Sequence, residues 1–269
     1  IAALAIGIAG CGGSDSQPAS ATGADAAATT SAQASEGNLA GFMRDIGVEL
    51  NEFWAENWGE GWKPAVVKIP ENSASTACGE IDATDSGPAY CGADSTMVLP
   101  VAFFQDQIID ADETLRNDAA VAGVLGHEFG HHLQTLAGLE DVVDEESAKN
   151  PEIANLLSVA YELHADCLMG IWMSSVDDEK RLEPGDLDEV LGALEKIGDD
   201  NLTAEAGATA DAGTFDHGTS EQRQVWFGVG FSTQDPEACN RVFDDLEDGT
   251  LEKELQAGAD AVNEASTAE

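Results

Sequence analysis

Three of the chain's five histidines fall within six residues, in the sequence HEFGHH at 127–132. His127, Glu128 and His131 fit the pattern H-E-x-x-H. Each residue of an α-helix turns by about 100°, so imidazoles four positions apart project from one face and can bind one divalent ion together. His132 points about 140° away from His127, so we expect it to have a structural role.

Zn²⁺ is the ion that this pattern favours, because two neutral imidazoles leave room for a third ligand and an open coordination position. Glu128 would lie beside that position and could accept a proton from water. The competing interpretation is a solvated polar face of a helix. Gly123, Gly126 and Gly130 surround the motif on an otherwise apolar segment. Each costs up to about 1 kcal/mol relative to alanine, which indicates that another segment approaches closely there.

A third ligand is offered by YELHAD at 161–166. Glu162 can complete a His₂Glu site, and Asp166, one helical turn later, can accept the outer N–H of a metal-binding imidazole. His164 is the competing ligand, but it points about 200° away from Glu162, so one helix cannot aim both at the same ion. We favour Glu162, because only Glu162 comes with a suitably spaced partner for the imidazole.

The fifth histidine opens the segment HGTSEQR at 217–223. His217 and Arg223 could stabilise the negative charge that develops on a carbonyl oxygen during acyl transfer. Alternatively, His217 caps a loop and Arg223 pairs with one of the many carboxylates. The sequence leaves these two interpretations open.

The elements that must position these residues are mainly helical. Apolar periodicity predicts helices from Asn38, the expected N-cap, through Trp54 and over 117–138, 150–175, 185–198 and 219–231, with Asn150 as the N-cap of the helix over 150–175. Thr219 and Gln222 have capping-box spacing. AVVKI at 65–69 and MVLPV at 97–101 are predicted strands, with a stapled loop or hairpin between them. The fold class is therefore mainly α with a small β element (α+β): one domain over 38–246, then an acidic C-terminal tail over 247–269 expected to lack a core.

The sequence resembles the bacterial neutral zinc metallopeptidases. The resemblance rests on HEFGHHLQ, ELHADCLMGIW, IGDDNL and HGTSEQRQVWFGVGFSTQDPEAC, with a weaker match through ACG…GPAYCGAD, and spans roughly residues 40–245. It implies a zincin-like, gluzincin-like enzyme in which His127, His131 and Glu162 bind zinc, Glu128 is the base and Asp166 supports an imidazole.

The spacing of His217 and Arg223, and the Glu-x-x-x-Asp arrangement, are also similar to those of membrane zinc endopeptidases of the CaaX-protease type. This second resemblance favours the role of His217 and Arg223 in charge stabilisation.

Charge excludes one class of partner. The chain has 11 Lys and Arg residues and 52 Asp and Glu residues, so its net charge is −41. Such a surface repels phosphate backbones, so we expect no nucleic-acid partner.

The N-terminal residues indicate export. IAALAIGIAG runs into Cys11 and resembles the end of a lipoprotein signal peptide, which would place a lipid on that cysteine. Residues 12–37 contain no aromatic residue and no Leu, Ile, Val or Met, and are predicted to form a flexible tether. We therefore expect an extracytoplasmic, membrane-anchored lipoprotein at the cell surface or the periplasmic face.

The other four cysteines favour two disulfides in an oxidising compartment, and three connectivities are open on number alone. Cys167 adjoins Asp166, and Cys239 lies just past the helix that carries Arg223. We predict a Cys167–Cys239 bridge between those segments and a local Cys78–Cys91 bridge.

Together these features predict a zinc-dependent peptidase, with one Zn²⁺ and a peptide or protein substrate, that cleaves by water activated at the metal. The rival from another class is a non-catalytic zinc-holding surface lipoprotein, a scaffold or interaction module, which would need the ligands but not Glu128. A solute-binding lipoprotein would need two α/β lobes, for which the chain has too few strands. The sequence does not define the oligomeric state.

Overall fold

The computed structural model describes residues 39–84, 86–110 and 118–268, with the side chain of residue 268 excepted. The signal segment with Cys11, the tether over 12–37 and the cap position of Asn38 lie outside the described residues.

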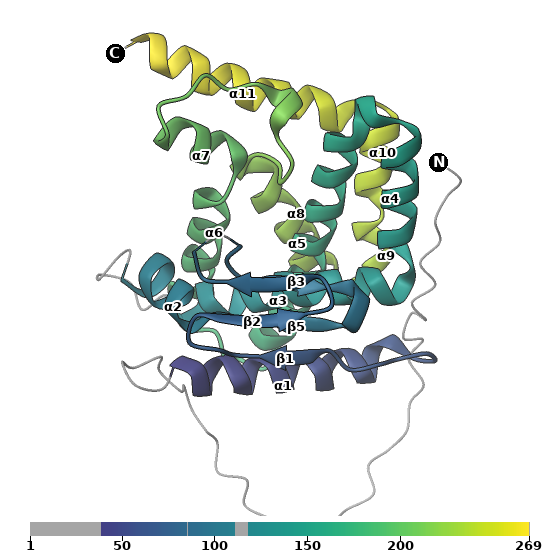
Figure 1. Ribbon diagram of the computed structural model, residues 1–269. Helices are drawn as coiled ribbons and strands as arrows, with labels where there is room; N and C mark the ends of the chain where they lie inside the picture. Colours follow the sequence, from purple (N-terminus) through teal and green to yellow (C-terminus); the bar gives the residue numbers. More distant parts are fainter. Residues whose placement is uncertain (1–38, 85, 111–117, 269) are drawn as a thin grey trace, which may run out of the picture.

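Helices make up most of the described chain (Figure 1). Their bounds are α1 Leu39–Trp58, α2 Val101–Phe104, α3 Asp118–Ala137, α4 Leu139–Lys149, α5 Ala154–Asp178, α6 Asp186–Lys196, α7 Asp199–Glu205, α8 Ser220–Thr233, α9 Pro236–Cys239, α10 Arg241–Glu247 and α11 Thr250–Ala268. Short 3₁₀ turns occur at Gly92–Asp94, Pro151–Ile153 and Ala212–Thr214, and a π turn at Gln105–Ile109.

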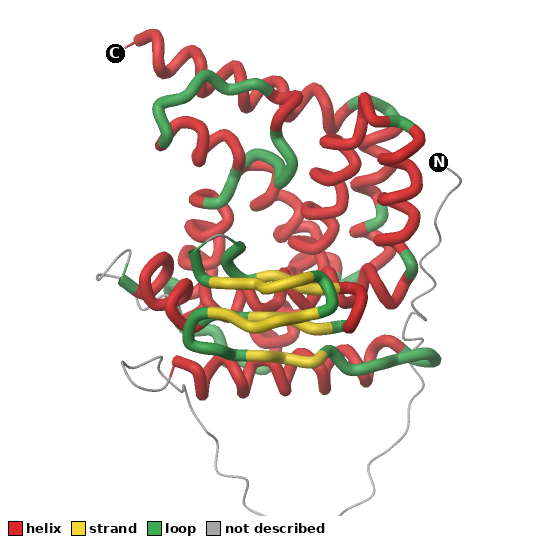
Figure 2. The backbone as a smooth tube through the Cα atoms, viewed as in Figure 1, coloured by secondary structure: helices red, strands yellow, loops and turns green. Residues whose placement is uncertain are grey.

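Five short strands form two small sheets beside these helices (Figure 2). β1 (Val66–Lys68) pairs in parallel with β5 (Thr96–Val98), and β5 pairs antiparallel with β4 (Ala89–Cys91). β2 (Ser73–Thr76) and β3 (Gly79–Asp82) form a hairpin. The strand predicted over 65–69 is confirmed as β1, and the one predicted over 97–101 is confirmed in part, because β5 ends at Val98 and Val101 begins α2. The mainly helical fold with a small β element is confirmed.

The closest helix packing near the sequence motif is between α3 and α5. A Cβ atom built on Gly130 would lie 2.9 Å from the Cα of Ala165, and one on Gly126 would lie 3.1 Å from both Met169 and Trp172. Lower numbers on α3 thus face higher numbers on α5, so the two helices run antiparallel. The close approach predicted from the glycines around the HEFGHH motif is confirmed.

On another side, α5 packs directly on α8. A Cβ atom on Gly170 would collide with the carbonyl of Phe227, and one on Gly230 would collide with the carbonyl of Cys167. The Cys167–Cys239 disulfide joins α5 to α9, which follows α8 in the chain. The predicted bridge is confirmed. It ties α5 to the segment that follows α8, and α5 itself packs against both α3 and α8.

The second predicted disulfide is also confirmed. Cys78, at the turn between β2 and β3, is bonded to Cys91 at the end of β4. The bridge attaches the hairpin to the three-stranded sheet.

The C-terminal segment differs from expectation. Residues 247–269 were predicted to lack a core, but α11 buries Leu251, Leu255 and Ala259 completely. These residues recur every four positions and form one apolar stripe, which is too sparse to stand out in a polar sequence. The prediction is wrong in this respect.

Local predictions at two helix starts had different outcomes. The capping box is confirmed: Thr219 accepts from the backbone of Gln222, whose side chain accepts from the backbone of Thr219. Asn150 does not cap the long helix; it precedes a 3₁₀ turn, and α5 begins at Ala154. The sequence also gave no indication of α4, which carries mostly polar residues.

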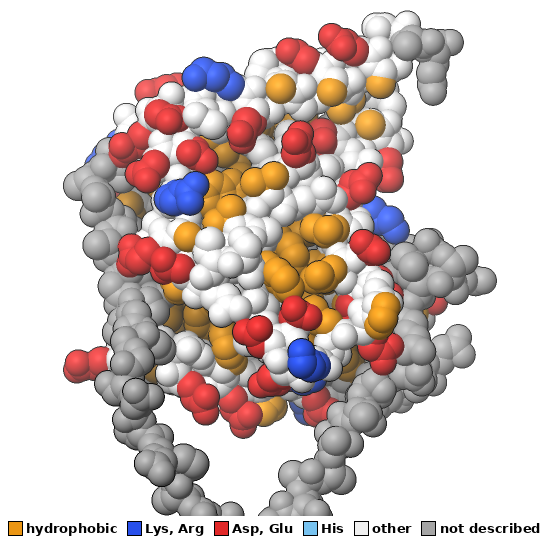
Figure 3. Space-filling view, turned by 180° about the vertical axis from the view of Figure 1, so that it is seen from behind, with side chains coloured by type: hydrophobic (Ala, Val, Ile, Leu, Met, Phe, Trp, Pro, Cys, Tyr) orange, Lys and Arg blue, Asp and Glu red, His pale blue; other side chains and the backbone are white. Residues whose placement is uncertain are grey.

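On the face shown in Figure 3, acidic side chains outnumber basic ones. Among the described helices, none is both long and apolar enough to cross a bilayer.

The glycine contacts between α5 and α8 yield a matched test. Gly230→Ala would press a methyl group against the backbone of Cys167, which the disulfide holds in place, so we expect a loss of about 3 kcal/mol in the free energy of unfolding. Gly228→Ala lies on the same helix with no neighbouring atom within 4 Å and should be stabilising by up to about 1 kcal/mol. Urea unfolding of both variants measures the difference, and equal stabilities would contradict the proposed packing.

Candidate metal centre and active site

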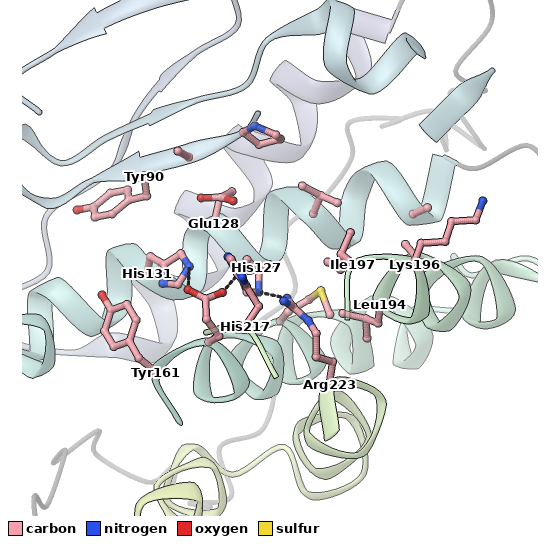
Figure 4. Close-up of a pocket in the computed structure, with 18 of the residues that line it drawn as sticks. Tyr90, His127, Glu128, His131, Tyr161, Leu194, Lys196, Ile197, His217 and Arg223 are labelled. Carbon is pink, nitrogen blue, oxygen red and sulfur yellow. Dashed lines mark hydrogen bonds and ion pairs between the residues drawn. The ribbon is translucent and has the colours of Figure 1, made fainter. Parts of the chain in front are cut away.

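Helices α3 and α5 bring three of the predicted ligands together. His127 Nε2 lies 3.1 Å from one carboxylate oxygen of Glu162, and His131 Nε2 lies 3.5 Å from the other. One donor atom from each of the three residues falls within 4.8 Å of the others. In Figure 4, His127 and His131 lie side by side, and dashed lines mark the ion pairs that their rings make with a carboxylate between them.

The donor atoms suit a tetrahedral zinc ion. With ligands about 2.0–2.1 Å from the ion, tetrahedral geometry requires donor atoms about 3.3 Å apart. The two imidazole-to-carboxylate separations, each to a different oxygen of Glu162, are 3.1 and 3.5 Å. The other nitrogen of each ring is held by an acceptor: His127 Nδ1 donates to Asp166 Oδ1 at 2.7 Å, and His131 Nδ1 donates to Gln134 Oε1 at 2.8 Å. With Nδ1 held in this way, each ring has its Nε2 directed at the Glu162 carboxylate, the nitrogen through which it would bind a metal ion.

Asp166 lies behind His127 and is also paired with Arg223. The Asp166 side chain is fully buried, and Arg223 Nη2 donates to its Oδ1 at 3.0 Å. The Arg223 guanidinium is itself only 2% exposed. Of the two interpretations of Arg223, the structure shows the pairing with a carboxylate, through which Arg223 supports His127.

His217 lies in a different environment at the wall of the same cleft. Its side chain is half exposed, with Nδ1 2.7 Å from Asp216 Oδ1 and 3.5 Å from Asp199 Oδ1. The second oxygen of Asp199 accepts the backbone N–H groups of residues 216, 217 and 218, which fixes the loop. Hydrogen bonding to Asp199, together with the nearby Glu162 and Asp216 carboxylates, raises the pKa of His217 against the effect of burial.

His164 is buried away from this cluster. Its Nδ1 accepts from the Gln134 amide at 3.2 Å, and its Nε2 donates to Asn240 Oδ1 at 3.2 Å. Burial lowers the pKa of His164 to about 4, so the ring is neutral. Of the two candidates for third ligand, Glu162 lies in the cluster and His164 does not.

Gln134 is a site residue that the sequence analysis missed. It accepts from His131, and its amide donates to the Tyr161 backbone carbonyl at 2.6 Å as well as to His164. Its position three residues after His131, on the same helical face, was the available signal.

The buried charges of the metal-free cluster stabilise one another. Burial alone would lower the pKa of His127, but the Asp166 and Glu162 carboxylates outweigh it and raise that pKa to about 10. Burial would raise the pKa of Glu162, but the imidazoles of His131 and His127 hold it well below its usual range. The raised pKa favours a protonated His127, so metal binding at Nε2 would compete with a proton.

Two residues of the HEFGHH motif remain. Glu128 lines the cleft while only 8% exposed, and burial raises the pKa of its carboxyl group. His132 is fully buried, donates from Nε2 to the Lys63 carbonyl at 2.8 Å and accepts at Nδ1 from the Tyr90 hydroxyl at 3.0 Å. The structural role predicted for His132 is confirmed.

The cluster opens into a cleft of about 1150 Å³. Its walls come from α3, α4, α5 and α6, and from β4 through Tyr90. In Figure 4, Tyr90 and Tyr161 lie on the His131 side, and Leu194 and Ile197 lie on the opposite side, beyond His127. A volume of this size accommodates a ligand several residues long.

Comparison with known proteins identifies a family. Residues 4–242 match the family described as "putative neutral zinc metallopeptidase", and the chain belongs to that family. It is 36% identical over 219 residues to the uncharacterised protein YpfJ of Escherichia coli K12, covering 79% of this chain and 74% of that protein. It is also 31% identical over 196 residues to an uncharacterised protein of Mycobacterium tuberculosis H37Rv, covering 66% of this chain and 65% of that one. No solved structure matches it.

The paired charges behind His127 define a stability test. Asp166→Ala would leave the Arg223 guanidinium buried without its carboxylate, and we expect a loss of about 3–5 kcal/mol in the free energy of unfolding. Glu49→Gln removes a partner of Arg181 at the surface, where Arg181 is 45% exposed, and should cost no more than about 1 kcal/mol. Urea denaturation in the presence of a chelator separates this effect from metal binding, and a similar small loss in both variants would refute it.

Proposed function

We propose that the protein is a zinc-dependent peptidase of the gluzincin-like type, with a zincin-like pair of ligand helices. The observation that carries the proposal is the convergence of two Nε2 atoms and one carboxylate at separations that suit zinc, beside Glu128 in an open cleft. His127, His131 and Glu162 would hold the ion, and Asp166 and Gln134 would orient the two imidazoles.

A bound zinc ion supplies a Lewis acid that polarises a peptide carbonyl and acidifies water. Glu128 takes the proton from the attacking water, whose oxygen forms a bond to the carbonyl carbon. When the C–N bond breaks, Glu128 gives the proton to the leaving amine, so the reaction consumes one water and yields a carboxylate and an amine. The raised pKa of the Glu128 carboxyl group suits this double role.

His217 is the residue that can stabilise developing negative charge on the carbonyl oxygen. Its ring is at the cleft wall, and the surrounding carboxylates favour its protonated form, a hydrogen-bond donor at both nitrogens. Arg223 is a positioning residue in this scheme, because its donor reaches Asp166 and lies behind His127.

We further propose that the enzyme acts outside the cytoplasm, held to the outer face of the membrane by a lipid on Cys11. The apolar segment before Cys11 and the two disulfides support this location. Mass spectrometry of the N-terminal peptide from the native host would reveal the lipid.

Two glutamates separate metal binding from chemistry. Glu128→Gln should bind zinc as tightly as the wild-type protein but lose about 10²–10⁴ in cleavage rate, because Gln cannot transfer the proton. Glu162→Gln should lose more zinc affinity than the ~10- to 100-fold typical of an outer partner, because it removes a ligand. Zinc titration and cleavage of an unfolded protein provide both readouts. Equal zinc binding by wild type and Glu128→Gln, with no cleavage by either, would favour the non-catalytic zinc-holding protein.

Removal of the metal should also lower stability. Zinc that binds only the folded state raises the free energy of unfolding by about 2.7 kcal/mol when its free concentration is ~100 times the dissociation constant. A chelator should therefore lower the Tm of the wild-type protein and have little effect on Glu162→Gln. Equal shifts in both proteins, measured by calorimetry, would argue against zinc at this cluster.

A further inference from the structure

The cleft continues past the metal cluster in both directions along α5. Ala154 and Ser158 line it on the N-terminal side of Glu162, and Met169 lines it on the C-terminal side. At 1.5 Å per helical residue, these limits lie about 12 Å and about 10 Å from Glu162. An extended chain advances about 3.3 Å per residue, so about three residues fit on each side of the cluster.

The two ends of the cleft differ in chemistry. The end beyond His131 has hydroxyl and carboxylate groups among its lining residues, which include Tyr90, Glu140, Asp144, Ser147, Ser158 and Tyr161. The end beyond His127, here called the apolar end, has six large apolar side chains beside the charged residues Asp188, Lys196 and Glu205 of α6 and α7: Val124, Met169, Val190, Leu194, Ile197 and Leu202.

Exposure distinguishes the apolar end from ordinary core. Five large apolar side chains are exposed in the described part of the chain, and Ile197 and Leu202, at 37% and 48%, are two of them. Both sit around the short connection between α6 and α7 and line the cleft, whereas the other three do not line it. Apolar surface that faces a cleft is available to an apolar ligand group.

The charge of the cleft limits its ligand further. Its carboxylates include Glu140, Asp144, Asp188 and Glu205, whereas Lys196 and Arg223 are its basic residues and Arg223 is paired with Asp166. A ligand with acidic groups would be repelled, and a ligand with basic groups would be attracted.

We propose that the cleft takes an extended, acid-poor segment inside a polypeptide chain and seats a large aliphatic side chain in the apolar end. This inference rests on the proposed peptidase function and defines it as an endopeptidase that cleaves beside such a residue. Ile197 and Leu202 are its specificity-determining residues.

The test uses peptides of about eight residues, acetylated and amidated, with lysine and serine around one varied position. Leucine at that position should give cleavage about 10- to 100-fold faster than serine, as burial of an aliphatic side chain implies. Glutamate in place of the flanking lysines should slow cleavage, and added salt should reduce that difference. Cleavage confined to peptides with a free terminus would overturn the endopeptidase assignment.

Variants of the apolar end provide the decisive comparison. The double variant Ile197→Asn, Leu202→Asn should lose most of the preference for leucine over serine, measured as the ratio of the two cleavage rates, because the apolar surface that would receive leucine is gone. Val48→Asn removes an equally exposed apolar side chain from α1, outside the cleft, and should retain the full preference. An unchanged preference in the double variant would overturn the subsite.

Binding separates this inference from the peptidase proposal. Glu128→Gln is expected to cleave about 10²–10⁴-fold more slowly, so fluorescence anisotropy of labelled peptides on this variant measures affinity with little interference from cleavage. Tighter binding of the leucine peptide, lost in the double variant made on that background, supports the apolar end even if no peptide is cleaved by the wild-type protein. Cleavage by the wild-type protein with equal affinity for both peptides leaves the peptidase standing and refutes the apolar end.

Discussion

The close antiparallel contact between α3 and α5 is the constraint on which the site depends. Gly130 lies against the backbone of Ala165, and a larger residue at position 130 would prevent this approach. At this separation the imidazoles of one helix reach the carboxylates of the other directly. The glycines that weaken α3 as an isolated helix thus allow it to bring His127 and His131 to the Glu162 carboxylate.

Buried charge then requires a third helix. The Asp166 carboxylate is fully buried, and a lone carboxylate there would be costly. Arg223 on α8 balances it while His127 uses the same oxygen. The glycine contacts of α5 with α8 and the Cys167–Cys239 bridge keep that helix close enough for the pairing. Packing and electrostatics therefore specify the same arrangement.

The sequence predicted the features whose signals are local. The spacing of His127 and His131, the capping box at Thr219 and the glycines of α3 each follow from helical periodicity alone. The role of Gln134 was missed, because the orientation of its side-chain amide is set by hydrogen bonds to Tyr161 and His164 on another helix. The core contacts of α11 were missed for a related reason: three small or aliphatic residues in a polar segment acquire meaning only against a partner surface.

His127 and His164 show how surroundings decide the role of a buried imidazole. Both rings are buried, His127 on α3 and His164 on α5. The pKa of His127 is nevertheless raised to about 10, whereas that of His164 is lowered to about 4. The partners of His127 are carboxylates, which favour a positive charge, whether a proton or a metal ion. The partners of His164 are amides, which satisfy both nitrogens, and the hydrogen bond to Asn240 raises the pKa by less than burial lowers it. The number of histidines in the sequence therefore exceeds the number that could serve as metal ligands. The carboxylates of α5 distinguish the candidate ligand His127 from the structural His164.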